Sequence, residues 1–292
     1  MKFVKLYVPA TIGNVGPGFD VLGLALEGLG NTYEISLCEG PSRLLGVTGI
    51  DADRVPSQVD QNLTFMAAHK MARALGYEDA HFAVRVHQEL PIGGGLGSSA
   101  AACLAGAYAA ERLLSPSPQG GEGFRVRSVA AEFEGHYDNL APAYYGGLTI
   151  ASSDFITQVP QGCDVWIVVV TPQNRLETKL ARSVLPKELP QADWVRQMAL
   201  SCALVCAWQR GDAHGIAQAL QDPFAEPRRA PLIPGFAGLK QAALESGALG
   251  CSISGAGPTV FAIFGDQSKA HVFAQKHNGS LGQVAKEGIP IC

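Results

Sequence analysis

Alternating apolar and polar residues predict several β-strands along the chain. Residues 3–10 alternate, and residues 81–90 place Phe82, Val84 and Val86 on one face of a second alternating strand. Other strand-like segments are apolar or rich in β-branched residues: 21–26, 33–37, 44–47, 163–171 and 260–264. The run at 163–171 is long enough to be a central strand of a second sheet.

Helical patterns lie between these strands. Residues 62–75 repeat apolar side chains at helical spacing, and residues 98–114 form an alanine-rich run of high helix propensity. Further helices are expected at 125–134, 178–185, 194–209 and 213–220, and after the strand at 260–264 as far as about residue 277. Strands and helices therefore share the chain, which indicates a protein of mixed secondary structure.

The order of these elements predicts two domains. We place the change ahead of the strand at 163–171, with an N-terminal domain of residues 1–155 and a C-terminal domain of residues 156–292. In the second part, two strands around a glycine-rich turn precede a helix and a closing strand. Together with the strand at 163–171, this order suits a ferredoxin-like α+β sandwich.

Composition narrows the class of protein. The 292 residues are 47% hydrophobic, which is ample for a packed core, and the net charge of −4 is too small to predict a nucleic-acid or anionic-membrane partner. No apolar stretch approaches the roughly 20 residues that span a bilayer, and the first residues lack the apolar core of a signal peptide. Seven scattered cysteines form no C-x-x-C pair, so we expect reduced thiols in a cytoplasmic protein.

The most informative segment is glycine-rich and joins a predicted strand to a predicted helix. It reads Pro91-Ile92-Gly93-Gly94-Gly95-Leu96-Gly97-Ser98-Ser99-Ala100-Ala101 and is called the phosphate loop below. Glycines permit positive φ and close approach of a ligand, so successive N–H groups can face one concavity at the start of the following helix. This predicts a cradle for a polyphosphate. A Walker A loop would need lysine where Gly97 stands, and a dinucleotide fingerprint would need glycine where Ser98 stands.

Polar residues in two other turn-rich segments each have a structural and a functional interpretation. Asn14 and Asp20, after the first strand, could be turn formers or could present an amide and a carboxylate to a small polar substrate. Glu134 ends a predicted helix, ahead of Asp138 and Asn139. This group could be a solvated charge followed by a turn. It could equally be a Mg²⁺ site, because an ion that bridges nucleotide phosphates needs only one or two protein oxygens.

Two features of the second half also stay open at this point. Arg182 and Arg229 could grip the carboxylate of an amino acid, since arginine binds carboxylates bidentately, or could lie in surface salt bridges. The glycine-rich turn at 254–258 could be a simple hairpin or part of the same phosphate pocket.

Three motifs, in order and spread over nearly the whole chain, resemble the kinase superfamily of galactokinase, homoserine kinase, mevalonate kinase and phosphomevalonate kinase. They are Pro9-Ala10-Thr11 with Asn14-Val15-Gly16-Pro17-Gly18-Phe19-Asp20, the phosphate loop, and Ser254-Gly255-Ala256-Gly257-Pro258-Thr259. Two segments are similar to the homoserine kinases in particular: His136-Tyr137-Asp138-Asn139-Leu140-Ala141-Pro142, and Glu226-Pro227 with Arg229 and Leu232-Ile233-Pro234. The resemblance implies a two-domain small-molecule kinase fold, with an N-terminal domain like domain 2 of ribosomal protein S5 and a ferredoxin-like C-terminal domain.

The resemblance also implies an activity: ATP- and Mg²⁺-dependent phosphorylation of the L-homoserine hydroxyl to O-phospho-L-homoserine, a step of threonine biosynthesis. By position, the phosphate loop would wrap the ATP phosphates, Asn62 would contact the adenine, and Ser99 with Glu134 would hold Mg²⁺. The other residues would surround the substrate: Asp20 at its ammonium, Arg182 and Arg229 at its carboxylate, and Asn14 and Asn139 at its hydroxyl. Asp138 stays a candidate base, and a homodimer is expected.

One departure from the resemblance concerns the spacing of two site residues. A short Gly/Ser-containing insertion is expected between Glu134 and the segment that holds Asn139, and this chain lacks it. Either a real deletion moves one of them out of place, or a loop is absent from the sequence. Two alternatives to homoserine phosphorylation also remain at this point: a related kinase of another small alcohol such as mevalonate, and a non-catalytic ATP-binding regulator.

Overall fold

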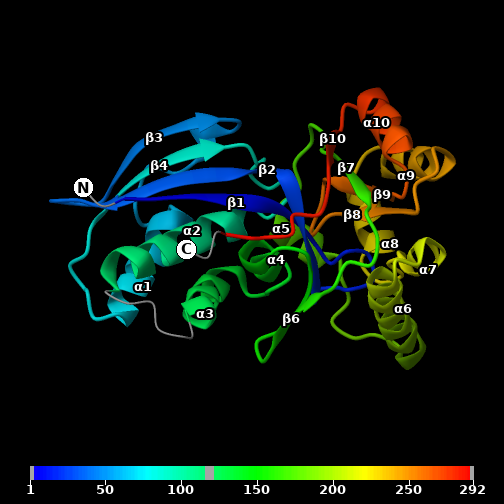
Figure 1. Ribbon diagram of the computed structural model, residues 1–292, viewed down its shortest axis with the longest axis horizontal. Helices are drawn as coiled ribbons and strands as arrows, with labels where there is room; N and C mark the ends of the chain where they lie inside the picture. The colour runs from blue at the N-terminus through cyan, green and yellow to red at the C-terminus, as the bar shows by residue number, and fades with distance from the viewer. Residues whose placement is uncertain (1–2, 116–121, 290–292) are drawn as a thin grey trace.

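The computed structural model describes residues 3–115 and 122–289 and arranges them around two β-sheets (Figure 1). The first sheet has six strands: β1 (Phe3–Gly13), β2 (Leu22–Leu37), β3 (Arg43–Gly49), β4 (Phe82–Gln88), β5 (Leu148–Ala151) and β6 (Ile156–Val159). The second sheet has four: β7 (Trp166–Val170), β8 (Gly250–Ile253), β9 (Val260–Phe264) and β10 (Ser280–Gly282). The predicted two-domain α+β fold is therefore confirmed.

Helices cover one side of the first sheet (Figure 1). They are α1 (Leu63–Ala74), α2 (Ser98–Leu114) and α3 (Glu122–Glu134), with the short η1 (Ala52–Arg54) and α4 (Leu140–Tyr145) before and after them. The alanine-rich α2 has the bounds predicted from its composition and is buried along most of its length. Its small residues allow close packing, since a Cβ at Gly106 would lie 2.0 Å from the carbonyl oxygen of Thr64 in α1.

The prediction of two separate strands at 21–26 and 33–37 is wrong, because the structure joins them in the single long strand β2. β2 pairs with β1 along both parts, and the register shifts between Pro9 and Ala10, opposite residues 27–29. Gly28 adopts a positive φ of 79° there. The polar break in the sequence pattern is thus a bulge within a strand, where extra residues are absorbed without ending the pairing.

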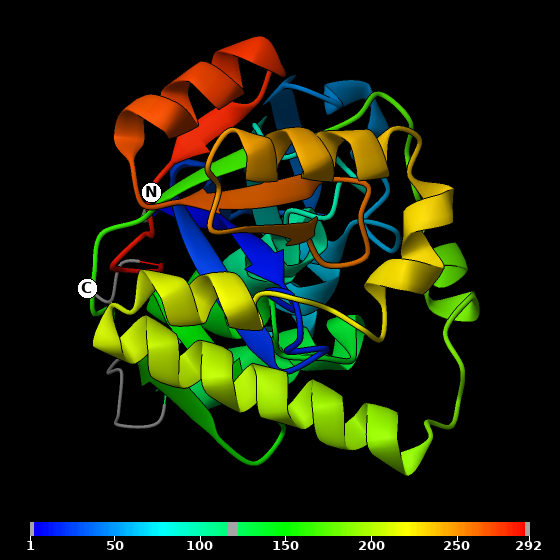
Figure 2. The ribbon, with the colours of Figure 1, turned by 90° about the vertical axis from the view of Figure 1, so that its right-hand side faces the viewer.

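The second sheet has the strand order β10-β7-β9-β8, with each neighbouring pair antiparallel. This is the order expected of a ferredoxin-like sandwich. The helices around the sheet are α5 (Thr178–Ser183), α6 (Gln191–Arg210), α7 (Ala213–Ala219), α8 (Glu226–Arg229), η2 (Ala230–Leu232), α9 (Phe236–Glu245) and α10 (Gln267–Lys276). Figure 2 faces this domain, with α9 and α10 above and α6 and α7 below.

Alternate side chains of the second sheet belong to two different cores. Val168 and Phe264 pack with residues of α9 and α10, whereas Ile167, Val169 and Ile263 join the large core that also holds the first sheet. Successive side chains of a strand point to opposite faces of the sheet, so these strands bury apolar side chains on both faces. The C-terminal sheet is therefore fastened to the N-terminal domain through its own packing.

The change between the two sheets comes later than the expected boundary at residues 155 and 156. β6 pairs with β5 as the last strand of the first sheet, so that sheet extends to Val159, and the second begins at Trp166. Short elements that the sequence pattern did not indicate are α4, β5, β6, α8 and α9. Among the described residues, no helix is both long enough and apolar enough to cross a membrane.

Candidate active site

The phosphate loop forms the wall of a pocket between the two domains. Gly93, Gly95 and Gly97 have positive φ values of 70°, 82° and 74°, a conformation that side chains disfavour. Gly97 immediately precedes α2, and Ser98 and Ser99 in the first turn of that helix line the same pocket. The N-terminal N–H groups of a helix and its dipole both favour an anion. The loop therefore has the geometry of the predicted phosphate cradle.

The loop cannot hold larger residues because neighbouring segments press against it. A Cβ at Gly97 would lie 2.0 Å from Oγ1 of Thr11 in β1, and a Cβ at Gly95 would lie 2.5 Å from the carbonyl oxygen of Ser254. The Ser254 hydroxyl also donates to the carbonyl oxygen of Gly95 (2.6 Å). The second glycine turn is thus both the β8–β9 hairpin and, through Gly255 and Ala256, a wall of the pocket.

Not every residue predicted to bind ATP presents a side chain to the pocket. Pro91, Gly93, Gly94 and Gly95 line it together with Gly97, Ser98 and Ser99. Leu96, Ala100 and Ala101 are buried in the core, so they can serve a ligand only through backbone groups. Ile92 is not among the residues that line this pocket.

Asn62 has a structural role at the start of α1. Its side-chain Oδ1 accepts a hydrogen bond from the backbone N–H of Thr64 (3.0 Å), and its Nδ2 donates to the carbonyl oxygen of Pro56 (2.8 Å). It is therefore the N-cap of α1, a position for which asparagine is favoured. Its contact with adenine stays a prediction.

The loop between β1 and β2 brings Asn14 and Asp20 into the same pocket. Both have positive φ values, 68° and 57°, so this loop is a tight, irregular structure. Asn14 accepts a hydrogen bond from the backbone N–H of Asp20 (2.9 Å) and donates one to the carbonyl oxygen of Gly255 (2.9 Å). The turn-forming and the functional interpretations of Asn14 are therefore compatible.

Both predicted arginines reach the pocket, and one of them binds Asp20. Arg182, from α5, donates two parallel hydrogen bonds to the Asp20 carboxylate (3.0 and 2.7 Å). Arg229, from α8, is buried and donates to the carbonyl oxygens of Ala181 (3.1 Å) and Gly255 (2.8 Å). Burial, followed by the nearby charge of Arg182, lowers the pKa of Arg229. Because Asp20 balances the charge of Arg182, Arg229 supplies the excess positive charge of this group of three residues, and that charge favours an anion.

Ser99 and Glu134 line the same pocket and contact one another. The Ser99 hydroxyl donates to Oε1 of Glu134, the last residue of α3. Burial raises the pKa of the Glu134 carboxyl, against the hydrogen bond from Ser99 and the charge of His136. The short connection to Asn139 displaces neither residue, because both line the pocket; Gly135 turns the chain with a φ of 78°.

A hydrogen-bonded network that the sequence did not reveal orients Asn139. Thr11 donates to Asn139 Oδ1 (2.8 Å), and Asn139 Nδ2 donates to Asp138 Oδ1 (3.2 Å). His136 Nδ1 also bonds to that Asp138 oxygen (2.5 Å). Burial lowers the pKa of His136, but this hydrogen bond and the charges of Asp138 and Asp20 outweigh it, so the pKa is raised. Thr11 belongs to the Pro9-Ala10-Thr11 motif, but the motif did not predict a role for its side chain. The hydrogen bond to Asn139 indicates that role.

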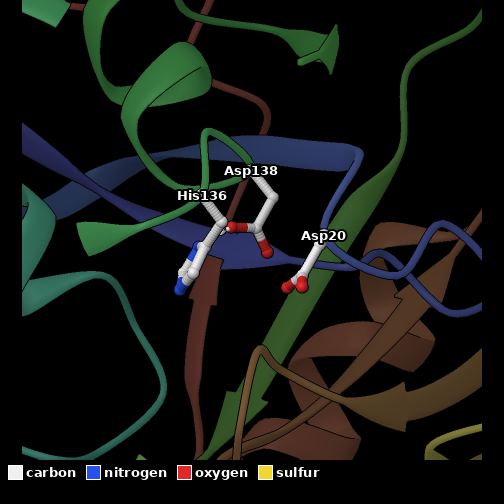
Figure 3. Close-up of side chains that lie close together, drawn as sticks. All are labelled: Asp20, His136 and Asp138. Carbon is white, nitrogen blue, oxygen red and sulfur yellow. Dashed lines mark hydrogen bonds and ion pairs between the residues drawn. The ribbon is translucent and has the colours of Figure 1, made fainter. Parts of the chain in front are cut away.

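Asp20, His136 and Asp138 lie together although they come from two segments (Figure 3). One ligand atom of each lies within 4.8 Å of the others, which is close enough for a cation. However, the charge of Asp20 is balanced by Arg182, and that of Asp138 is partly balanced by His136. We therefore interpret this cluster as the polar wall of a substrate site. Ser99 and Glu134 offer another set of oxygen donors that could hold Mg²⁺, and they lie where α2 begins, directly after the phosphate loop.

Comparison with known proteins agrees with this geometry. Residues 62–147 match the GHMP kinases N-terminal domain, and residues 203–281 match the GHMP kinases C-terminal domain. The homoserine kinase of Thermococcus kodakarensis is 39% identical over 267 residues, which cover 89% of this chain and 88% of that protein. The homoserine kinase of Thermus thermophilus is 37% identical over 299 residues, which cover 99% of this chain and 97% of that protein.

This chain belongs to the homoserine kinase family of the GHMP kinases. Among solved structures, the homoserine kinase of Cytophaga hutchinsonii superimposes with a TM-score of 0.90 at 32% identity, covering 99% of this chain and 97% of that one. L. major mevalonate kinase shares the fold, with a TM-score of 0.72 at 14% identity, covering 96% of this chain and 95% of that one. The chain is therefore a kinase, and its family implies the use of ATP.

Proposed function

We propose that this kinase transfers the γ-phosphoryl group of ATP to the side-chain hydroxyl of L-homoserine, releasing O-phospho-L-homoserine for threonine biosynthesis in the cytoplasm. One observation carries the choice of substrate: a carboxylate, Asp20, and two guanidinium groups, Arg182 and Arg229, line one pocket with the phosphate loop. Such a pocket complements a molecule with an ammonium and a carboxylate at one end. Mevalonate lacks the ammonium, so if its carboxylate took Arg182 from Asp20, no group of the substrate would compensate the Asp20 charge.

The pairing of Asp20 with Arg182 suggests how the zwitterion binds. The ammonium of homoserine would replace the guanidinium at Asp20, and the carboxylate of homoserine would replace Asp20 at Arg182. Asp20 and Arg182 thus each exchange one oppositely charged partner for another. Binding therefore leaves no unpaired charge in a partly buried site. Arg229 already donates from Nε and Nη1 to backbone carbonyls. These hydrogen bonds hold its guanidinium rigidly in the pocket that Asp20 and Arg182 also line.

Asn14 and Asn139 would hold the reacting hydroxyl. Asn139 Oδ1 already accepts from Thr11, so the amide can offer the substrate oxygen its second N–H but cannot remove a proton from it. This suits phosphoryl transfer, which depends mainly on positioning and charge neutralisation. Asp138 holds the Asn139 amide in place. We keep Asp138 as the candidate base, and the pH–rate profile of an Asp138→Asn enzyme tests that role.

The phosphate loop and the start of α2 would bind the ATP phosphates, and Ser99 with Glu134 would hold Mg²⁺. When bound, Mg²⁺ neutralises charge on the β- and γ-phosphates. Glu134 has a raised pKa, so a proton competes for its carboxylate at a higher pH than for an ordinary glutamate. The carboxylate form is therefore lost as the pH falls through that raised pKa.

Replacing Glu134 with glutamine is expected to raise the Mg²⁺ concentration for half-maximal activity by about 10-fold or more. In the unmodified enzyme this concentration should rise as the pH falls, because the proton and the metal compete; in the variant it should stay flat. Titration of activity with Mg²⁺ at several pH values measures both. Glu132→Gln, on an exposed side chain of the same helix, is the matched control. An unchanged Mg²⁺ requirement in the Glu134 variant would remove this assignment.

The activity itself is tested by phosphorus NMR of the products formed from ATP with homoserine, mevalonate or galactose. We expect a phosphomonoester from homoserine alone, together with homoserine-dependent release of ADP. A product from mevalonate instead would support the related-kinase alternative. ATP binding with no substrate-dependent ADP release would support a non-catalytic regulator.

We further propose a homodimer in which α6 packs against the same helix of a second copy. Trp194, Val195 and Met198 are 52%, 47% and 45% exposed, and Cys202 continues this apolar stripe along the 20-residue helix. An antiparallel pair would also bring acidic first turns of the helix toward basic last turns. Sedimentation should show a dimer that Met198→Glu converts to a monomer and Gln275→Glu, on α10, leaves intact. A monomeric unmodified protein would contradict this proposal.

A further inference from the structure

Asp51 lies outside the pocket but binds the backbone of the phosphate loop. It follows β3 and precedes η1, with a positive φ of 53°. One of its carboxylate oxygens, Oδ2, accepts a hydrogen bond from the backbone N–H of Ile92 (2.9 Å). The side chain is largely buried, with 13% of its surface exposed. The Asp51 carboxylate therefore binds the backbone of Ile92, the residue that precedes Gly93, the first glycine of the loop with a positive φ.

Arg175 completes this contact from the other domain. It lies between β7 and α5 and donates through Nη1 to Asp51 Oδ2 (2.9 Å) and through Nη2 to Asp51 Oδ1. Nη1 also donates to the carbonyl oxygen of Ile92 (2.9 Å). Burial raises the pKa of Asp51, but the hydrogen bonds from Arg175 and from the Ile92 N–H outweigh it, so the pKa is lowered.

The N–H and the C=O of Ile92 are thus both held by one ion pair, which we call the clamp (Asp51 and Arg175). Arg54 adds a longer hydrogen bond to the same carbonyl oxygen (3.3 Å). The clamp joins residues 124 positions apart, one from each domain. Glycine-rich loops are flexible by nature, so a fixed peptide beside Gly93 limits the conformations that the loop can adopt.

We propose that Asp51 and Arg175 are positioning residues that hold the phosphate loop in the shape that binds ATP, so that the C-terminal domain sets the affinity of the N-terminal loop. This inference rests on the proposed binding of ATP phosphates by that loop. Neither residue needs to touch the nucleotide. An isolated surface ion pair has little effect, but this pair is bidentate, one partner is largely buried, and both hold the same peptide.

The alternative is that Arg175 itself contacts a phosphate. The two possibilities predict different effects of Asp51→Asn on ATP affinity. If the pair acts through the loop, Asp51→Asn and Arg175→Met both weaken ATP binding, because either change breaks the ion pair and so loosens its hold on the Ile92 peptide. If Arg175 acts directly, Asp51→Asn leaves ATP binding unchanged or strengthens it, because a competing negative charge is lost. The effect of Asp51→Asn therefore decides between them.

The test measures equilibrium binding of a fluorescent ATP analogue, which requires no turnover, and the KM values for ATP and homoserine. We expect about a 10-fold loss of ATP affinity in each single variant and no further loss in the double variant, since the two act as one unit. The KM for homoserine should change less than twofold. Lys5→Met, which breaks an exposed ion pair of the first sheet with Glu34, should change neither.

Three outcomes would overturn the proposal. These are ATP affinity within twofold of normal in Asp51→Asn whatever the effect of Arg175→Met, strengthened binding in Asp51→Asn, and equal losses for ATP and homoserine together with a lowered melting temperature. The last would indicate a general structural role. A failure of the proposed function appears differently, as ATP binding by the unmodified protein without homoserine-dependent ADP release. The binding measurement then still tests the clamp.

Discussion

Replacing Asn139 with alanine is expected to lower kcat about 100- to 1,000-fold, the range found when one donor to a reacting oxygen is removed. The KM for ATP should stay within about twofold, because the hydrogen bonds described above that hold the phosphate loop come from Ser254, Asp51 and Arg175 and not from this amide. The reason for the large effect is geometric: Thr11 and Asp138 hold Asn139 in one orientation. Initial rates at saturating ATP and homoserine measure kcat, and a thermal melt checks that the variant folds.

Thr11→Val tests the orientation of the Asn139 amide more directly than a substitution on the protein surface would. It leaves the Asn139 amide in place but removes the hydrogen bond to its Oδ1 (2.8 Å), so kcat should fall by a smaller factor, about 10-fold. The double variant Thr11→Val/Asn139→Ala should be no slower than Asn139→Ala alone, because Thr11 acts through Asn139. Independent, additive losses would contradict this chain of contacts, and an unchanged kcat in Asn139→Ala would dismiss the role of the amide.

Replacing Asp20 with asparagine is expected to raise the KM for homoserine about 10- to 100-fold, since a hydrogen bond to a charged group contributes about 1.5–3 kcal/mol and each 1.4 kcal/mol is tenfold. The variant loses the partner of the substrate ammonium and also leaves Arg182 without its carboxylate. ATP binding should be nearly unaffected. Steady-state kinetics with each substrate varied in turn provides the measurement.

A substrate analogue separates the two effects of that change. The unmodified enzyme should strongly prefer homoserine to 4-hydroxybutyrate, which lacks the ammonium, and Asp20→Asn should lose most of this preference. Asp154→Asn, in the exposed turn between β5 and β6, is the control and should keep it. If the preference survives in the Asp20 variant, the ammonium is recognised elsewhere.

Local patterns were sufficient where neighbouring residues decide the structure. The alanine run predicted α2 with its observed bounds, and the apolar run at 260–264 did the same for β9. They were insufficient for β2, where a bulge at residues 27–29 interrupts the apolar pattern without interrupting the strand. Pairing with β1 decides that case, because hydrogen bonds to a neighbouring strand can carry a chain through a polar break. The short strands β5 and β6 likewise depend on their partners.

In the candidate site, too, the sequence predicted some features and the tertiary structure decided others. The resemblance to the kinase superfamily implied roles for the phosphate loop, Asn14, Asp20, Glu134, Asn139 and the two arginines, and the structure brings them to one pocket. They did not reveal Thr11 as the partner of Asn139, nor that Asp20 and Arg182 bind one another. In addition, the sequence alone left open whether the short connection after Glu134 displaces a site residue. A single turn at Gly135 accommodates it.

The sequence by itself determined the glycines whose backbone can surround a phosphate, the helix that follows them, and the types of charged and polar group available to a substrate. Only the tertiary structure decided which groups meet: Asp20 with Arg182, 162 positions away, Thr11 with Asn139, 128 away, and Asp51 with Arg175, 124 away. The physical reason is that backbone freedom and helix propensity act between neighbours in the chain. A hydrogen bond across such distances exists only once both domains have packed.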